Sequence, residues 1–148
     1  MTVGATTLTR RNVHQVSAIE RTANAPWWVQ EVETFLLVDA PKQILSRTGS
    51  GLLVHDDDVL VAVAAHRPHH KWTAELLQAF LVLPALRNKG LAAPALRCAL
   101  AHVHVVAKVE HVMWLVHQEN TAMLRVSTSI ADPAAPADTD GFVTFAEP

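Results

Sequence analysis

Residues 82–92 read VLPALRNKGLA, and this stretch decides the fold. An apolar run ends at Pro84, a polar turn carries Gly90, and a long segment with an apolar stripe follows. The pattern predicts a buried strand that passes through a tight turn into a helix. The first amides of a helix lack partners and carry partial positive charge, and glycine lets a ligand approach the backbone. With Arg87 and Lys89 nearby, the turn predicts a phosphate or pyrophosphate site.

The turn does not match the two common nucleotide-binding loops. It lacks the second glycine and the Lys-Ser/Thr pair of a P-loop, and it is not a GxGxxG sequence. A single glycine between a strand and a helix is common, so a turn without a ligand explains the same residues equally well. Both interpretations stay open on physical grounds alone.

Apolar periodicity predicts further strands and helices on both sides of this turn. The strand that precedes the turn is apolar on both faces, which favours a central place in the sheet. The resulting order is typical of a mixed α/β chain with a strand–helix–strand unit in its second half. The predicted strands are 6–10, 52–54, 59–65, 75–83, 112–116 and 142–145; the predicted helices are 12–23, one that begins at Pro26 and ends before Pro41, 91–108 and 120–128; 66–71 and 132–140 are expected to be loops.

Composition narrows the function classes. The chain has 148 residues, of which 50% are apolar and 18% charged, with a formal net charge of −2. We therefore expect one folded domain over 1–148, neither disordered nor a basic nucleic-acid binder. A single cysteine, Cys98, excludes an intramolecular disulfide and a Cys-rich zinc module. No apolar run has the length of a membrane span or the form of a leader, so we expect a soluble, cytoplasmic protein.

No metal site is expected. His66, His69 and His70 lie close together in the chain, but no carboxylate or cysteine nearby completes a ligand set. Histidines gathered in a loop are usually solvated.

Two segments resemble the GNAT superfamily of acetyl-CoA-dependent N-acyltransferases. One is the strand end Val82-Leu83-Pro84 followed by the run RNKGLA at 87–92, and the other is the strand 112–116 followed by Asn120 and a short helix. The element order also matches that family over about residues 5 to 146. The resemblance implies a central mixed, mostly antiparallel sheet flanked by helices on both faces.

The resemblance also implies where the acyl donor, acetyl-CoA, would bind. Backbone groups of the strand end would pair with the pantetheine arm, amides of the turn would hold the pyrophosphate, and the asparagine would contact the cofactor arm. The implied residues are Leu81, Val82 and Leu83 for the arm, Arg87, Asn88, Lys89, Gly90, Leu91 and Ala92 for the pyrophosphate, and Asn120.

The chain departs from the family at its catalytic positions. The family usually places a tyrosine after the asparagine to protonate the departing thiolate, but Ser127 stands at that position and the chain has no tyrosine. The strand positions that often carry a base are Leu76 and Gln78, which cannot accept a proton usefully. The catalytic candidates are therefore Ser127 as a weak acid or water relay and His117 as a base, with His66 as a further candidate base.

Two functions stay open. The first is transfer of an acetyl group from acetyl-CoA directly to a primary amine of an unidentified acceptor, and the intact turn favours it. The second is a GNAT-fold module without turnover that binds acyl-CoA or serves in an assembly. Trp27 is expected to line an acceptor pocket or face a partner, and Trp28 to join the core. We expect no nucleic-acid or membrane partner, and a homodimer is left open.

Overall fold

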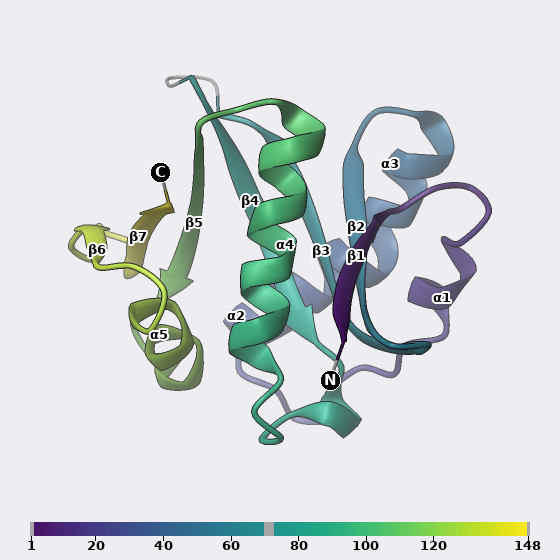
Figure 1. Ribbon diagram of the computed structural model, residues 1–148. Helices are drawn as coiled ribbons and strands as arrows, with labels where there is room; N and C mark the ends of the chain where they lie inside the picture. The colour runs from purple at the N-terminus through teal and green to yellow at the C-terminus, as the bar shows by residue number, and fades with distance from the viewer. Residues whose placement is uncertain (1, 70–72, 148) are drawn as a thin grey trace.

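A mixed sheet forms the centre of the protein (Figure 1). The computed structural model describes residues 2–69 and 73–147, and within them the strand order is β1-β2-β3-β4-β5-β7-β6. Only β4 and β5 run parallel; every other neighbouring pair is antiparallel. The strands are β1 Val3–Thr7, β2 Ser50–Asp56, β3 Val59–Pro68, β4 Ala74–Val82, β5 His111–His117, β6 Pro133–Ala135 and β7 Phe142–Glu147.

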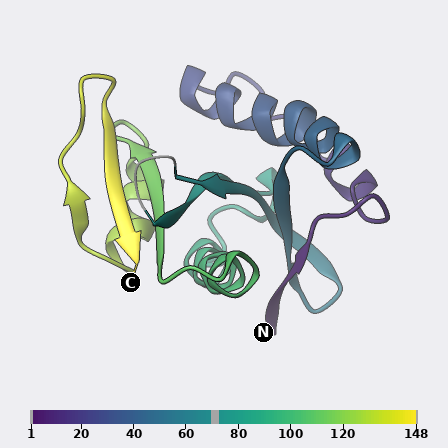
Figure 2. The same cartoon turned by 90° about the horizontal axis from the view of Figure 1, so that it is seen from above.

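Helices cover both faces of the sheet, as the view from above shows (Figure 2). Helix α4 crosses one face, and the α2–η1–α3 run lies on the other side, against β2, β3 and β4. The helices are α1 His14–Ser17, α2 Trp27–Thr34, the π-helical η1 Phe35–Asp39, α3 Ala40–Ser46, the 3₁₀ turn η2 Pro84–Leu86, α4 Ala92–Ala107 and α5 Thr121–Thr128. This arrangement confirms the predicted mixed, mostly antiparallel sheet with helices on both faces. None of the described helices is long and apolar enough to cross a membrane.

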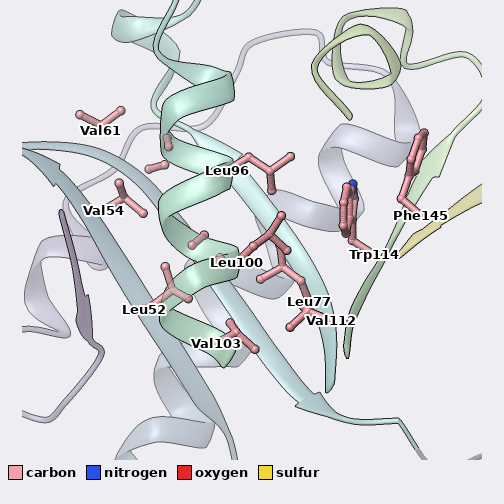
Figure 3. Packing of buried hydrophobic residues seen from close by; sticks show 14 of the residues in the cluster. Leu52, Val54, Val61, Leu77, Leu96, Leu100, Val103, Val112, Trp114 and Phe145 are labelled. Atoms are coloured by element: carbon pink, nitrogen blue, oxygen red, sulfur yellow. The ribbon is translucent and has the colours of Figure 1, made fainter. Parts of the chain in front are cut away.

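The larger core lies between α4 and the sheet. Leu96, Leu100 and Val103 form the buried stripe of α4 and are fully buried. They pack on side chains of β2, β4 and β5, and the cluster continues to Trp114 and Phe145 (Figure 3). A smaller core on the opposite face joins β2, β3 and β4 to η1 and α3. Both faces of β4 are therefore fixed by packing.

A bulge changes the course of β4 in its middle. Ala65 of β3 lies opposite Ala79, whereas the next residue, His66, lies opposite Leu77, so Gln78 is the extra residue on β4. A bulge bends its strand and shifts the alternation of its side chains by one. Accordingly, Leu77 belongs to the α4 core, whereas Ala79 belongs to the opposite core.

Several predicted boundaries were wrong. The helix does not end before Pro41: the π-helical turn η1 ends just ahead, and α3 takes the proline into its first turn, where a missing N–H is tolerated. The segment 132–140 is not all loop, because β6 pairs with β7. The first strand lies earlier than predicted, the first helix keeps one turn, and His66 belongs to β3.

Candidate functional site

The parallel strands β4 and β5 separate part-way along their length. They pair only from Ala74–His111 to Leu77–Trp114, whereas β4 remains paired with β3 as far as Val82. The half of β4 beyond the bulge therefore has a free edge toward β5. Figure 1 shows the two strands diverging below this point.

The hydrogen bonds of β4 show which backbone groups face this gap. Leu83 donates its N–H to the carbonyl of Val61 at 2.9 Å, so Leu83 is turned toward β3. Backbone groups alternate along a strand, which turns Leu81 the same way and points those of Phe80 and Val82 into the gap. Of the three residues expected to pair with a pantetheine arm, Val82 alone has this orientation, which it shares with Phe80, a residue outside that prediction.

A groove of about 490 Å³ runs from this gap to the turn before α4. Helix α5 contributes to its lining, and so do Trp28, Val29 and Val32 of α2. Most residues predicted for the cofactor lie in its wall, whereas Leu83 and Lys89 do not appear among the lining residues. The predicted residues that line it are Leu81, Val82, Arg87, Asn88, Gly90, Leu91, Ala92 and Asn120.

The N-terminus of α4 presents unpaired amides to the groove. The N-cap residue is Leu91, whose side chain cannot accept a hydrogen bond, and no acidic residue stands in the first turn. Asn88 and Gly90 both have positive φ, 62° and 73°, which folds the turn tightly. A Cβ at Gly90 would meet nothing within 4 Å, so the space in front of this turn is open. Open space beside uncapped helix amides fits a phosphate group.

The far wall of the groove was missed by the sequence analysis. Met123 and Val126 line it from α5, and Asn120 caps that helix by accepting a hydrogen bond from the Met123 N–H at 3.2 Å. Met123 and Val126 are one helical turn apart, and this spacing was the signal in the sequence that they share one face of a helix. Trp28 and Val32 have the same kind of spacing and were predicted to be core, because a groove wall and a core face show the same apolar pattern.

The side chain of Arg87 is turned inward. Its guanidinium donates from Nε to the Val82 carbonyl at 3.1 Å and from NH1 to Thr22 Oγ1 at 2.8 Å. Its NH2 lies 3.8 Å from Oε1 of Glu33, a carboxylate that is 1% exposed and accepts the Thr22 N–H on both oxygens. Arg87 therefore ties the end of β4 to the segment that leads into α2.

His117 ends β5 within a cluster of aromatic rings. Its ring stacks on Trp28, with centroids 4.9 Å apart, and its Nδ1 accepts the backbone N–H of Glu119 at 3.2 Å. An N–H can only donate, so Nδ1 is the unprotonated nitrogen and the neutral ring carries its hydrogen on Nε2. The lone pair that a base needs is thus engaged in this geometry, and a catalytic role for His117 stays a prediction.

Ser127 and His66 lie away from the groove lining. Ser127 is fully buried, and its Oγ accepts the indole N–H of Trp114 at 2.9 Å. His66 is buried against Glu75, with Nδ1 2.8 Å from Oε1, at the end of β4 opposite the gap. Both geometries favour structural roles, and the acid role of Ser127 stays a prediction.

The described part of the chain contains no group of three or more His, Cys, Asp or Glu side chains that could hold a metal ion. Of the three histidines weighed as a metal cluster, His70 lies outside the described residues, and His66 is paired as above.

Comparison with known families decides the classification. A model of the GNAT acetyltransferase domain matches residues 7–130. The chain belongs to the GNAT acetyltransferase family. A search of curated proteins found no match.

Solved structures share this GNAT fold at low sequence identity. The spermidine/spermine N-acetyltransferase SpeG from Vibrio cholerae, in mutant form, is 12% identical over 99% of this chain and 94% of its own, with a TM-score of 0.66. A spermidine N-acetyltransferase from Vibrio cholerae, in complex with CoA and spermine, is 11% identical over 98% of this chain and 94% of its own, with a TM-score of 0.64. The PaiA N-acetyltransferase from Thermoplasma acidophilum, in complex with coenzyme A, is 11% identical over 99% of both chains, at 0.68. These likenesses show the fold.

Replacing Ser127 tests its structural role. Ser127→Ala leaves the buried Trp114 N–H without an acceptor, and we expect a loss of about 1–3 kcal/mol in the free energy of unfolding. Denaturant unfolding measures it, with exposed Ser129→Ala as the matched control at about 0.5 kcal/mol or less. An unchanged stability together with a loss of turnover would instead support the acid role.

Replacing Arg87 tests whether its side chain braces the end of β4. Arg87→Ala removes the charge partner of the buried Glu33, and we expect a loss of about 1–3 kcal/mol because the guanidinium is partly exposed. Arg125→Ala, an exposed arginine in the same groove, should leave the melting temperature nearly unchanged. Equal melting temperatures in both variants would contradict the bracing role.

Proposed function

We propose that this protein is an N-acetyltransferase that moves an acetyl group from acetyl-CoA directly to a primary amine. The observation that carries the proposal is the continuity of the groove: the unpaired edge of β4 leads directly to the uncapped N-terminus of α4. Membership of the GNAT family supports it. Structures of the same fold with coenzyme A support the donor, and the one with CoA and spermine supports an amine as acceptor.

Each end of the groove suits one end of the donor. The amides around Gly90 and the N-terminus of α4 would hold the pyrophosphate, with help from the helix dipole. The backbone groups of Phe80 and the N–H of Val82 would pair with the amides of the pantetheine arm as an added strand, while the Val82 carbonyl already accepts Arg87 Nε. The reacting end would then lie near Trp28, where α2 lines the groove. A donor common in cytoplasm supports the expected cytoplasmic location.

Acetyl-CoA supplies an activated thioester: the amine nitrogen attacks its carbonyl carbon, the C–N bond forms, the C–S bond breaks, and the electron pair leaves with sulfur. A free N–H on the β4 edge would polarise the carbonyl oxygen. Holding amine and thioester in contact supplies much of the remaining acceleration.

Within the described residues, the catalytic candidates Ser127 and His117 offer little acid or base catalysis. Ser127 is buried under the Trp114 indole, and Nδ1 of His117 is engaged. A thiol has an ordinary pKa of about 8.5, so the thiolate leaves without a protein acid at a modest cost. The proton released by the amine passes to water. We infer a slow enzyme whose rate rises with the fraction of neutral amine.

The buried hydroxyl of Ser127 and the engaged Nδ1 of His117 also favour a second candidate. This candidate is a GNAT-fold protein that binds acyl-CoA without turning it over. Both candidates predict donor binding, and only the first predicts release of free CoA when an amine is added.

Donor binding is tested by thermal unfolding with and without millimolar acetyl-CoA. We expect the melting temperature to rise because the ligand binds only the folded state. Gly90→Glu should abolish the rise, since it places a carboxylate and a strained side chain at the proposed pyrophosphate position. The matched control is Gly4→Glu on β1, where a Cβ also meets nothing within 4 Å, and it should keep the rise.

An unchanged rise in Gly90→Glu would mean that the pyrophosphate lies elsewhere. The absence of any rise in the unmodified protein would contradict both candidates. Release of free thiol from acetyl-CoA over a panel of primary amines then separates the enzyme from the binding protein.

A further inference from the structure

Next to the reacting end of the groove lies an aromatic patch that the proposed mechanism does not use. We define the aromatic patch as Trp27, His117, Phe142, Leu115 and Thr144. Trp27 meets the His117 ring edge-on at 5.1 Å and the Phe142 ring at 6.5 Å. Although it contacts these rings and Trp28, its side chain is 48% exposed.

The aromatic patch continues along the sheet. Leu115 lies two residues before His117 on β5 and therefore on the same face, and it is 47% exposed. On β7, Thr144 lies opposite Leu115, and Phe142 lies opposite His117. Helix α2 reaches this face through Trp27 and Trp28, whose rings contact His117 and Phe142, while Leu115 beside them stays half exposed.

Trp28 joins the aromatic patch to the groove. One side of its ring stacks on His117, with planes 7° apart, and the residue also lines the groove where the acetyl group is expected. An acceptor resting on Trp27 therefore lies one aromatic ring away from the reacting end. This continuity favours a substrate as the occupant of the aromatic patch.

The chemistry of the aromatic patch selects among amines. Trp27, Phe142 and Leu115 are apolar, and the remaining members, Thr144 and His117, carry no fixed charge. A polyamine with several positive charges would find no carboxylate among the members of the aromatic patch themselves. The carboxylate of Asp138 lies at its edge, since Oδ1 accepts the Phe142 N–H at 2.9 Å. Asp140, Glu119 and Glu31 lie two to four residues from members of the aromatic patch, and all four carboxylates are exposed to solvent. An amine with one positive charge and an aromatic body matches this surface better.

We propose that the acceptor is a primary amine with an aromatic body, an arylalkylamine, that stacks on Trp27 beside the reacting end of the groove. The inference rests on the proposed acetyl transfer and adds its substrate class. Trp27 is already held by three neighbouring rings, so stacking on it costs little conformational entropy.

The test compares 2-phenylethylamine with ethylamine and spermidine as acceptors for acetyl-CoA. We expect kcat/KM for 2-phenylethylamine to exceed that for each of the other amines by about tenfold or more. In Trp27→Ala the ratio of kcat/KM for 2-phenylethylamine to that for ethylamine should fall about tenfold, through KM. Trp27→Phe should restore most of the ratio because it keeps a ring.

The matched control is Val105→Ala, which removes an apolar side chain that is 76% exposed on α4, and the ratio should not change. Equilibrium dialysis of 2-phenylethylamine against the CoA-bound protein makes the same comparison without turnover. An equal or higher kcat/KM for spermidine, or a ratio unaffected by Trp27→Ala, would overturn the inference.

Two further outcomes are distinguishable. If acetyl-CoA raises the melting temperature but 2-phenylethylamine neither reacts nor binds, the substrate class fails while donor binding stands. If sedimentation shows a dimer that Trp27→Ala dissociates, the aromatic patch is an interface between two copies and the inference is overturned. Loss of the donor-induced rise itself would mark failure of the proposed function.

Discussion

The site depends on a single interruption of hydrogen bonding between β4 and β5. Strand β4 cannot follow β5 beyond Leu77, because the bulge at Gln78 bends it and its pairing with β3 holds it as far as Val82. Buried unpaired backbone groups would be costly, and here they face a groove that a ligand or water can fill. The groove, the free strand edge and the approach to α4 all follow from this separation.

Much of the fold was predictable from local patterns. The strands around Asp56–Asp58, the strand before Pro84 and the helix after Gly90 each follow from apolar periodicity bounded by turn residues. Pro41 misled the prediction because a π-helical turn, which depends on packing around η1, reset the helix. The bulge was also hidden, since Gln78 is simply a polar residue in an apolar strand until its partner on β3 is known.

The site was predictable where it depends on backbone and less so where it depends on side-chain partners. The turn at 87–92 lines the groove with two residues of positive φ and with the free amides of a helix start. The glycine and the start of the apolar helical pattern indicate both features in the sequence. The hydroxyl of Ser127 is engaged because it accepts the Trp114 indole N–H. The side chain of Arg87 is turned inward because it contacts Thr22 and Glu33. These contacts join residues that are far apart in the chain, so no spacing rule identifies them.

The position of Trp28 has an optical consequence. The chain has no tyrosine, so its near-ultraviolet emission comes from tryptophan alone. The Trp114 indole is buried and hydrogen-bonded, whereas Trp28 borders both the groove and the aromatic patch. Its indole therefore stands where either ligand would change the local polarity. The protein carries its own fluorophore at the boundary between the groove and the aromatic patch.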